Sequence, residues 1–177
     1  MVGNAYLYNT PAGFVGRPTR QPAPLSITQG VLSEQASWVN NGVGTPVVFG
    51  TGGVIQPVSS TTTSADIYGI VASFYGGFAG LGTDDAWDSV QTPVTLTNQI
   101  MPIMRFGYIA VKVQNTTQPK AGGKVYIRVA GTTSTLLLGG FEAAADSTAS
   151  NTIEFVGAVF TGGIDRNGVS EISFSTM

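Results

Sequence analysis

The sequence predicts an all-β protein, either a β-barrel or a β-sandwich with about eight to ten short strands. Short runs rich in β-branched and aromatic residues recur along the chain, separated by turn residues such as glycine, proline and asparagine. No stretch has the period of a long helix. The 24 glycines among 177 residues suit the bulges and corners of curved sheets.

Residues 1–30 are predicted to form an extended arm, followed by a single β domain over residues 31–177. The stretch from Pro11 to Pro24 is rich in proline and glycine, and proline is excluded from helix interiors and central strands. We expect the arm to lie on a neighbouring subunit, because its apolar side chains would gain nothing in a solvated tail. The alternative is an inert lead-in or a frayed end. The residues predicted to contact the partner are Phe14, Val15, Arg17 and Arg20.

The strands expected after the arm are short runs with β-forming residues. They are residues 46–49, 54–58, 67–74, 105–114, 124–129, 136–141, 153–160 and 171–174. Residues 94–104 are also apolar but lack a clean period. The alternation in residues 124–129 is the clearest, and it predicts two faces. The inward side chains are Val125, Ile127 and Val129, and the outward ones are Lys124, Tyr126 and Arg128.

Two segments share one pattern, a polar Ser/Thr run, an acid and then a short apolar strand interrupted by a glycine. They are residues 61–74 and 147–160. When Gly69 is aligned with Gly157, the pairs that coincide are Asp66 with Glu154, Ile67 with Phe155 and Val71 with Val159. A strand-like run precedes each copy. The sequence therefore predicts a weakly duplicated β unit.

Composition narrows the classes of function. The chain has no cysteine and no histidine, so disulfides, thiolate metal sites and the commonest general base are missing. Charged residues make up only 10% of the chain, with a net charge of -2, against a typical value of ~25%. We infer that partners cover much of the surface. The alternative is an ordinary surface of serine, threonine, glycine and asparagine.

Contacts with nucleic acid and membrane are not expected. The chain has no basic field for nucleic acid, and no apolar run approaches the ~20 residues of a membrane helix. The N-terminus has no basic segment leading into an apolar one, so no secretory signal is expected.

Catalytic and metal-binding patterns are weak. Asp84, Asp85 and Asp88 form the one acidic cluster, but their spacing does not match a calcium-binding loop. The abundant hydroxyl groups lack a histidine to activate them. We predict no enzyme, no metal and no cofactor, although a pair of carboxylates distant in sequence stays open. Trp38, Trp87 and the tyrosines are candidates for a sugar-stacking face, but tryptophan in a β-protein is more often in the core.

Several motifs occur in a characteristic order. They are Gly13-Phe14-x-Gly16-x-x-x-Arg20, Val48-Phe49-Gly50, Gly53-Val54 with Pro57, Asp66-Ile67-Tyr68-Gly69-Ile70-Val71, Gly107-Tyr108-Ile109-Ala110-Val111, Gly123-Lys124-Val125-Tyr126 and Asn167-Gly168-Val169-Ser170-Glu171-Ile172. In this order they resemble the structural cement, or head decoration, proteins of tailed bacteriophages. The resemblance covers residues 13–172, and residues 75–103 match nothing in it.

The resemblance implies a barrel or sandwich that binds the outer face of an expanded capsid, at junctions between capsomers. The expected partners are the major capsid protein and the protein itself, as a homodimer or homotrimer. The protein would be made in the host cytoplasm and clamp neighbouring capsid subunits against internal DNA pressure. Deleting the chain before about Val31 is expected to weaken capsid binding and leave the core folded. The alternative function is a carbohydrate- or receptor-binding β-module of a phage tail.

Overall fold

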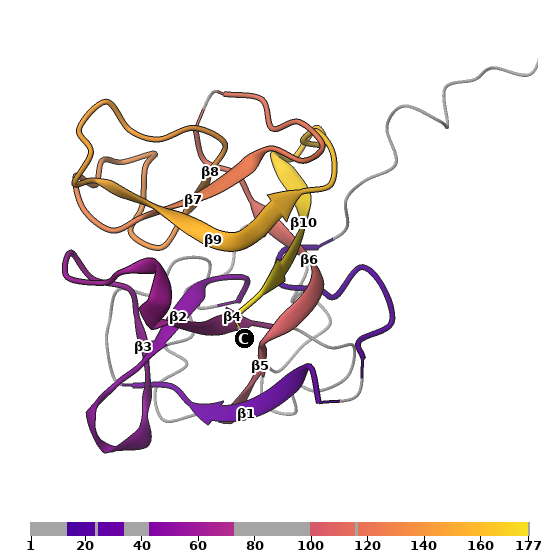
Figure 1. Cartoon of the computed structure of the whole chain (residues 1–177), viewed down its shortest axis with the longest axis vertical. Coiled ribbons are helices and arrows are strands. Elements are labelled where there is room, and N and C mark those ends of the chain that lie inside the picture. The colour runs from indigo at the N-terminus through magenta and orange to yellow at the C-terminus, as the bar shows by residue number, and fades with distance from the viewer. Residues whose placement is uncertain (1–13, 24, 34–42, 73–99, 116, 177) are drawn as a thin grey trace, which may run out of the picture.

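The protein folds into two five-stranded antiparallel sheets that pack into a sandwich (Figure 1). The computed structural model describes residues 14–23, 25–33, 43–72, 100–115 and 117–176. The first sheet contains β1 (Ile27–Val31), β2 (Pro46–Phe49), β3 (Ile55–Pro57), β4 (Ile67–Val71) and β5 (Ile100–Met104). The second contains β6 (Phe106–Lys112), β7 (Lys124–Arg128), β8 (Phe141–Glu142), β9 (Thr152–Phe160) and β10 (Val169–Ser175). The predicted all-β class is confirmed, as a sandwich and not as a closed barrel.

The two sheets have the same strand order. The first is ordered β1-β5-β4-β2-β3 and the second β6-β10-β9-β7-β8, so each strand of the first has a counterpart five places later. The aligned glycines lie in the two middle strands, β4 and β9. With Gly69 on Gly157, Ile70 falls on Ala158, and these two residues pair with Met104 of β5 and Phe174 of β10 respectively. The predicted duplication therefore corresponds to a repeated topology.

The edges of each sheet also meet in the same way. A single parallel bridge joins Leu32, just after β1, to Ile55 in β3, and another joins Val113, just after β6, to Phe141 in β8. The next residue along the chain donates its amide in each case, Ser33 to the Ile55 carbonyl and Gln114 to the Phe141 carbonyl, both at 2.9 Å. One bridge is too little to close a barrel, but it curls each sheet.

The first sheet has apolar side chains on both faces. One face contributes Ile67, Ile70 and Met104 to the core between the sheets. The opposite face holds a second cluster of buried residues: Leu32, Val47, Ile55, Val71, Met101 and Ile103. A strand buried on both faces reads as a continuous apolar run. This is why β5, with the sequence IMPIM, shows no period.

The second sheet alternates between a core face and a polar face. Val125 and Ile127 of β7 enter the core between the sheets, as predicted. Lys124 is exposed, but Arg128, which was predicted to point outward into solvent, is 1% exposed. Its side chain is covered because β8 brings Glu142 onto it and the chain after β8 brings Asp146. The expected strand over residues 136–141 is also shorter than predicted, since only its last residue belongs to β8.

The two halves of the duplication are in direct contact. The first Ser/Thr run ends in a short 3-10 turn, η4 (Ser64–Asp66), where the Asp66 carboxylate accepts the amide and hydroxyl of Thr63, both at 2.7 Å. The hydroxyl of Ser64 accepts the amide of Val156 in β9 at 2.9 Å. A second 3-10 turn, η3 (Thr51–Gly53), connects β2 and β3. No helix in the described ranges is long and apolar enough to cross a membrane.

Candidate interaction surface

Residues 14–20 lie along the edge of the second sheet, next to β6. The amide of Gly16 donates to the Ala110 carbonyl at 2.7 Å, and the amide of Ala110 donates to the Arg17 carbonyl at 3.0 Å. Thr19 donates to the Tyr108 carbonyl at 3.1 Å, and Pro18 forms an antiparallel bridge with Ile109. The segment therefore covers the amide and carbonyl groups that β6 would otherwise leave open at a sheet edge.

Two glycines let this segment touch the first sheet as well. Gly16 and Gly44 both have left-handed backbones, with φ of 77° and 70°. A Cβ on Gly16 would lie 2.7 Å from the Gly44 nitrogen, and one on Gly44 would lie 2.8 Å from the Gly16 nitrogen. Gly44 in turn donates to the Val71 carbonyl at the end of β4, at 2.8 Å. Residues 14–20 thus tie the two sheets together at one side of the sandwich.

Glu171 of β10 fixes the far end of the segment. Its carboxylate accepts a hydrogen bond from the Thr19 hydroxyl and another from the Thr161 hydroxyl at 2.7 Å. It also forms an ion pair with Arg20 at 3.1 Å. The Arg20 guanidinium also lies 3.7 Å from the centre of the Tyr108 ring. Burial raises the pKa of Glu171, but these hydrogen bonds outweigh burial and hold the pKa below its ordinary value.

The four residues predicted to contact a partner differ in where their side chains lie. Phe14 is 50% exposed and Arg17 is exposed. Val15 is half-buried, and Arg20 is directed onto Tyr108 and Glu171 of its own chain. The predicted arm boundary at residue 30 falls inside β1, which pairs along its whole length with β5. A contact of these four side chains with another subunit stays a prediction.

Five of the eight large apolar side chains that are exposed among the described residues belong to the N-terminal half. The large apolar residues with exposed side chains there are Phe14, Leu25, Val31, Phe49 and Ile100. In the C-terminal half they are Leu137, Val156 and Val159. Single exposed apolar residues are common on proteins. Here Val31 and Ile100 are paired neighbours on β1 and β5, so they form one continuous apolar spot.

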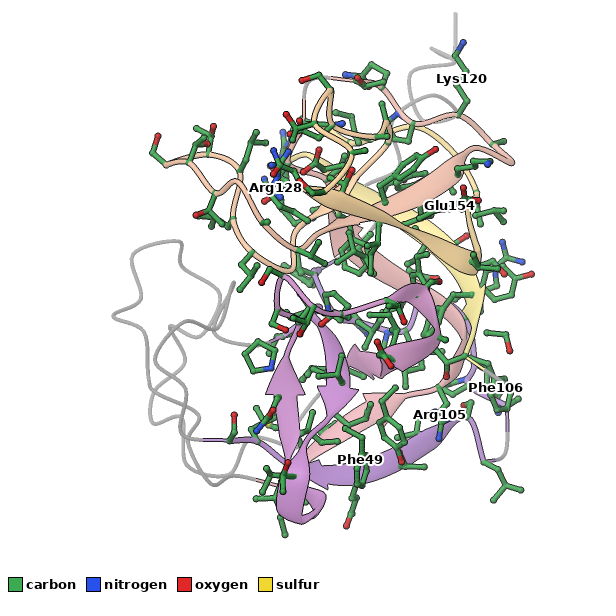
Figure 2. All side chains as sticks on the ribbon, turned by 60° about the vertical axis from the view of Figure 1, so that its left-hand side comes forward. Phe49, Arg105, Phe106, Lys120, Arg128 and Glu154 are labelled. Atoms are coloured by element: carbon green, nitrogen blue, oxygen red, sulfur yellow. The ribbon has the colours of Figure 1, made fainter. Side chains whose placement is uncertain are left out.

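A row of contacts runs from Phe49 through Tyr68 to Arg105, and Figure 2 labels Phe49 and Arg105. The rings of Phe49 and Tyr68 meet edge to face with centroids 4.9 Å apart, and the Arg105 guanidinium lies 4.1 Å from the Tyr68 centroid. The Arg105 side chain also donates to the Thr176 hydroxyl at 3.0 Å, which fixes the C-terminal end of the chain. Phe49, at the end of the row, is 56% exposed.

The second sheet holds a buried ion network around Arg128, the position of which is labelled in Figure 2. Arg128 contacts both carboxylate oxygens of Glu142, at 2.6 and 3.2 Å, and Asp146 at 2.7 Å. The Thr148 amide and the Arg128 guanidinium lower the pKa of Asp146 to about 2. Burial opposes the charge on Arg128, but the two carboxylates raise its pKa above the ordinary value. Every group is paired, so the network holds loops in place and has no free base for chemistry.

Other predicted site residues fall outside the described ranges, namely Trp38, Asp84, Asp85, Trp87 and Asp88. Among the described residues, no group of three or more acids could hold a metal ion. Sequence reasoning missed Glu171 as the anchor of residues 14–20. Its partner Arg20 lies 151 residues away, and no local pattern marks such a pair.

The described residues define a two-sheet all-β protein with an anchored N-terminal segment and apolar side chains on its surface. A family model described as "Structural cement protein (E217 gp24/Pam3 gp6)" matches residues 2–175. Among solved structures, a chain in "The capsid of Myoviridae Phage XM1" has a similar fold, with a TM-score of 0.63. It is 19% identical, and the match covers 99% of this chain and 98% of that chain. No curated protein matches the chain.

The family match covers nearly the whole chain, so the protein belongs to the phage structural cement proteins. The predicted family is confirmed, and with it the role of a capsid cement or decoration protein associated with the phage capsid. The family is one of structural proteins. Neither comparison supports the alternative of a tail module.

Proposed function

We propose that the protein binds the outer surface of the phage capsid and holds neighbouring major capsid protein subunits together, as a homodimer or homotrimer and without catalysis. The family match supports the association with the capsid. The choice of surface rests on the larger share of exposed apolar side chains in the N-terminal half, which includes the segment anchored at Glu171. In this proposal, that half faces the capsid.

Such a protein stabilises the shell by mass action. A ligand that binds the assembled shell better than free subunits shifts the equilibrium toward assembly. When copies are linked in an oligomer, the second contact is intramolecular and gains from effective concentration. Each single contact can then be weak, which fits a surface with scattered apolar side chains and few charges.

The four predicted residues have two roles in this proposal. Phe14 and Arg17, whose side chains are exposed, contact the capsid subunit. Val15 and Arg20 hold the segment on its own domain, through the close approach at Gly44 and the ion pair with Glu171. A segment that is already ordered loses less entropy when it binds. Residues 1–13 belong to the same predicted arm and lie outside the described ranges.

The test uses shells assembled without this protein, to which purified protein is added. Bound copies per shell are counted after co-sedimentation, and shell stability is followed by heating. We expect saturable binding and a higher disruption temperature. Sedimentation velocity on the free protein would measure a dimer or a trimer. Intact shells that take up no protein, or shells whose heat resistance does not change at full occupancy, would refute the proposal.

Two variants test the role of the anchored segment. Glu171→Gln removes the charge that holds Arg20, and deletion of residues 1–13 leaves the paired residues 14–20 in place. We expect both to weaken shell binding while the protein stays folded. Glu154→Gln is the matched control, because Glu154 forms an exposed ion pair with Lys124 on the second sheet. Equal binding by all three variants would show that the segment does not contact the capsid.

A further inference from the structure

Leu25 occupies a backbone conformation that leucine rarely adopts. It has φ of 66°, and every other described residue with positive φ is a glycine. The amide of Ser26 donates to the Ala23 carbonyl at 3.1 Å, which closes a four-residue turn with Leu25 at its third position. A turn with positive φ at that position normally has glycine or asparagine there. The Cβ of leucine crowds the following carbonyl in this region, so the residue is strained.

The Leu25 side chain is not buried within its own chain, so no burial offsets this strain. It is 89% exposed, the largest exposed fraction among the large apolar residues of the described chain. The isolated protein therefore holds an apolar side chain in water at the cost of backbone strain. Strain of this kind persists where the surrounding structure imposes it, and it concentrates at functional sites.

The turn that carries Leu25 is held firmly. The Ser26 side chain is fully buried and donates to the Ala23 carbonyl at 2.7 Å. The Ser26 carbonyl accepts the amide of Arg105 at 2.6 Å, and β1 begins at the next residue. Leu25 is thus presented from a fixed position between residues 14–20 and the first sheet. A side chain that is positioned before binding makes an apolar anchor at little entropic cost.

We propose that Leu25 inserts into an apolar pocket on a capsid protein subunit, a contact that rests on the proposed function. Arg20, close to Leu25 in the sequence, is paired with Glu171 of the same chain, so charge does not choose the partner. The family match associates the chain with the phage capsid, and a capsid subunit is therefore the partner of this proposal. A contact between two copies of the chain is the other outcome that the test distinguishes.

The test compares three variants of the full chain on shells assembled without the protein. Leu25→Asn keeps a residue that tolerates positive φ but removes the apolar side chain. Leu25→Met keeps an apolar side chain of similar size. Val156→Asn is the control, because Val156 is 68% exposed on β9 of the other sheet. Shell affinity is measured by co-sedimentation, stability by thermal unfolding and oligomeric state by sedimentation velocity.

We expect Leu25→Asn to bind shells about 10- to 100-fold more weakly, the effect of exposing one buried leucine. Its unfolding temperature should stay equal or rise, because the backbone strain is relieved. Leu25→Met and Val156→Asn should bind within about 3-fold of the original chain, less than the 1.4 kcal/mol of a tenfold change. Opposite changes in affinity and stability distinguish a binding residue from one that merely supports the fold.

Three outcomes would overturn the proposal. If the original chain and Leu25→Asn bind shells equally, Leu25 is no anchor, although the proposed function stands. If Leu25→Asn changes the oligomeric state and leaves the affinity for shells intact, the contact is between copies. If the original chain itself does not bind intact shells, the proposed function fails and this contact falls with it.

Discussion

The two sheets share a topology but differ in their chemistry. Strand order, the pairing of the middle strand and the bridge between the edges are repeated. Yet the five strands of the first sheet contain no Asp, Glu, Lys or Arg. The charged residues within strands of the second sheet are Lys112, Lys124, Arg128, Glu142, Glu154 and Glu171. Apolar pattern and turns fix the arrangement of strands, while the charges are free to vary.

Burial explains most of this difference. The first sheet has buried clusters on both faces, so a charge on any of its central strands would lose its water. The second sheet has one core face, and its other face is polar. The low charge of the chain therefore comes partly from a sheet buried on both faces. For this reason, the proposed capsid contact rests on exposed side chains and not on composition.

The largest effect is expected when a partner is removed from the buried network of the second sheet. Arg128→Met leaves the Glu142 carboxylate, 3% exposed, without its cation. Breaking a buried ion pair in this way costs about 3–5 kcal/mol of the free energy of unfolding. Chemical denaturation followed by circular dichroism would measure it.

The double variant Arg128→Met with Glu142→Leu serves as the control for this prediction. Removing both charges leaves no fully buried ion without a partner. Asp146 also loses its cation but is 17% exposed and keeps the hydrogen bond from the Thr148 amide, so part of the lost stability should return. A single variant as stable as the original chain, or a double variant less stable than the single one, would show that the network does not behave as a buried ion pair.

The aligned glycines are expected to give the next largest effects, for different reasons in the two sheets. A Cβ on Gly69 would lie 2.5 Å from the Met104 carbonyl oxygen. Gly157 has φ of 87°, and a Cβ there would lie 2.8 Å from the Ser175 carbonyl oxygen. Alanine at either position should cost about 1–3 kcal/mol, through overpacking in β4 and mainly through backbone strain in β9.

Asparagine distinguishes these two causes. At Gly69 it is larger than alanine and should be worse, whereas at Gly157 it tolerates positive φ and should be milder than alanine. Denaturation midpoints of the four single variants would show the crossed order. If alanine and asparagine variants have the same order of stability at both positions, the two glycines are required for the same physical reason.

A smaller effect is expected from acid. The pKa of Asp146 is lowered to about 2 and that of Glu171 is below its ordinary value. A carboxyl group with a lowered pKa stabilises the fold above its ordinary pKa of about 4. That contribution is lost as the pH falls from about 4 toward the lowered value. In the described N-terminal half the one carboxylate is Asp66, whose pKa is also lowered by the hydrogen bonds from Thr63, but which is exposed and holds only the local turn before β4.

Acid should therefore loosen residues 14–20 and the second sheet before the first. Hydrogen exchange at pH 7 and pH 3, corrected for intrinsic rates, would report the protection of each strand. In Glu171→Gln, the protection of residues 14–20 should already be reduced at pH 7 and should change less with pH. Equal loss of protection in both sheets would argue against this assignment.

The sequence was sufficient for features with a local pattern. Alternation marked β7, and the shared Ser/Thr-to-strand unit led to the repeated topology around Gly69 and Gly157. In both copies a neighbouring backbone lies too close to the strand for a side chain at this position. Both copies therefore have glycine there, and this shared glycine made the two segments easy to align.

Features that depend on distant partners were not visible in the same way. Arg128 alternates like a solvent-facing residue, and only the fold brings Glu142 and Asp146 onto it. The Pro/Gly-rich stretch pointed to an extended chain, but its pairing with β6 and its anchor at Glu171 are tertiary contacts. The positive φ of Leu25 had no signal, since the sequence suggests glycine or asparagine for such a turn.

The smallest effect is expected at the exposed ion pair of the second sheet. Lys124 and Glu154 are 2.8 Å apart, with side chains 63% and 39% exposed. The hydrogen bond to Glu154 raises the pKa of Lys124, so any stabilisation is present below its ordinary pKa of about 10.4 and is lost at higher pH. Water and salt screen such a pair, and Glu154→Gln should leave the denaturation midpoint unchanged at physiological salt. Glu154→Gln could instead destabilise the fold as much as Arg128→Met. In that case burial would not explain why one ion pair of the second sheet stabilises the fold and the other does not.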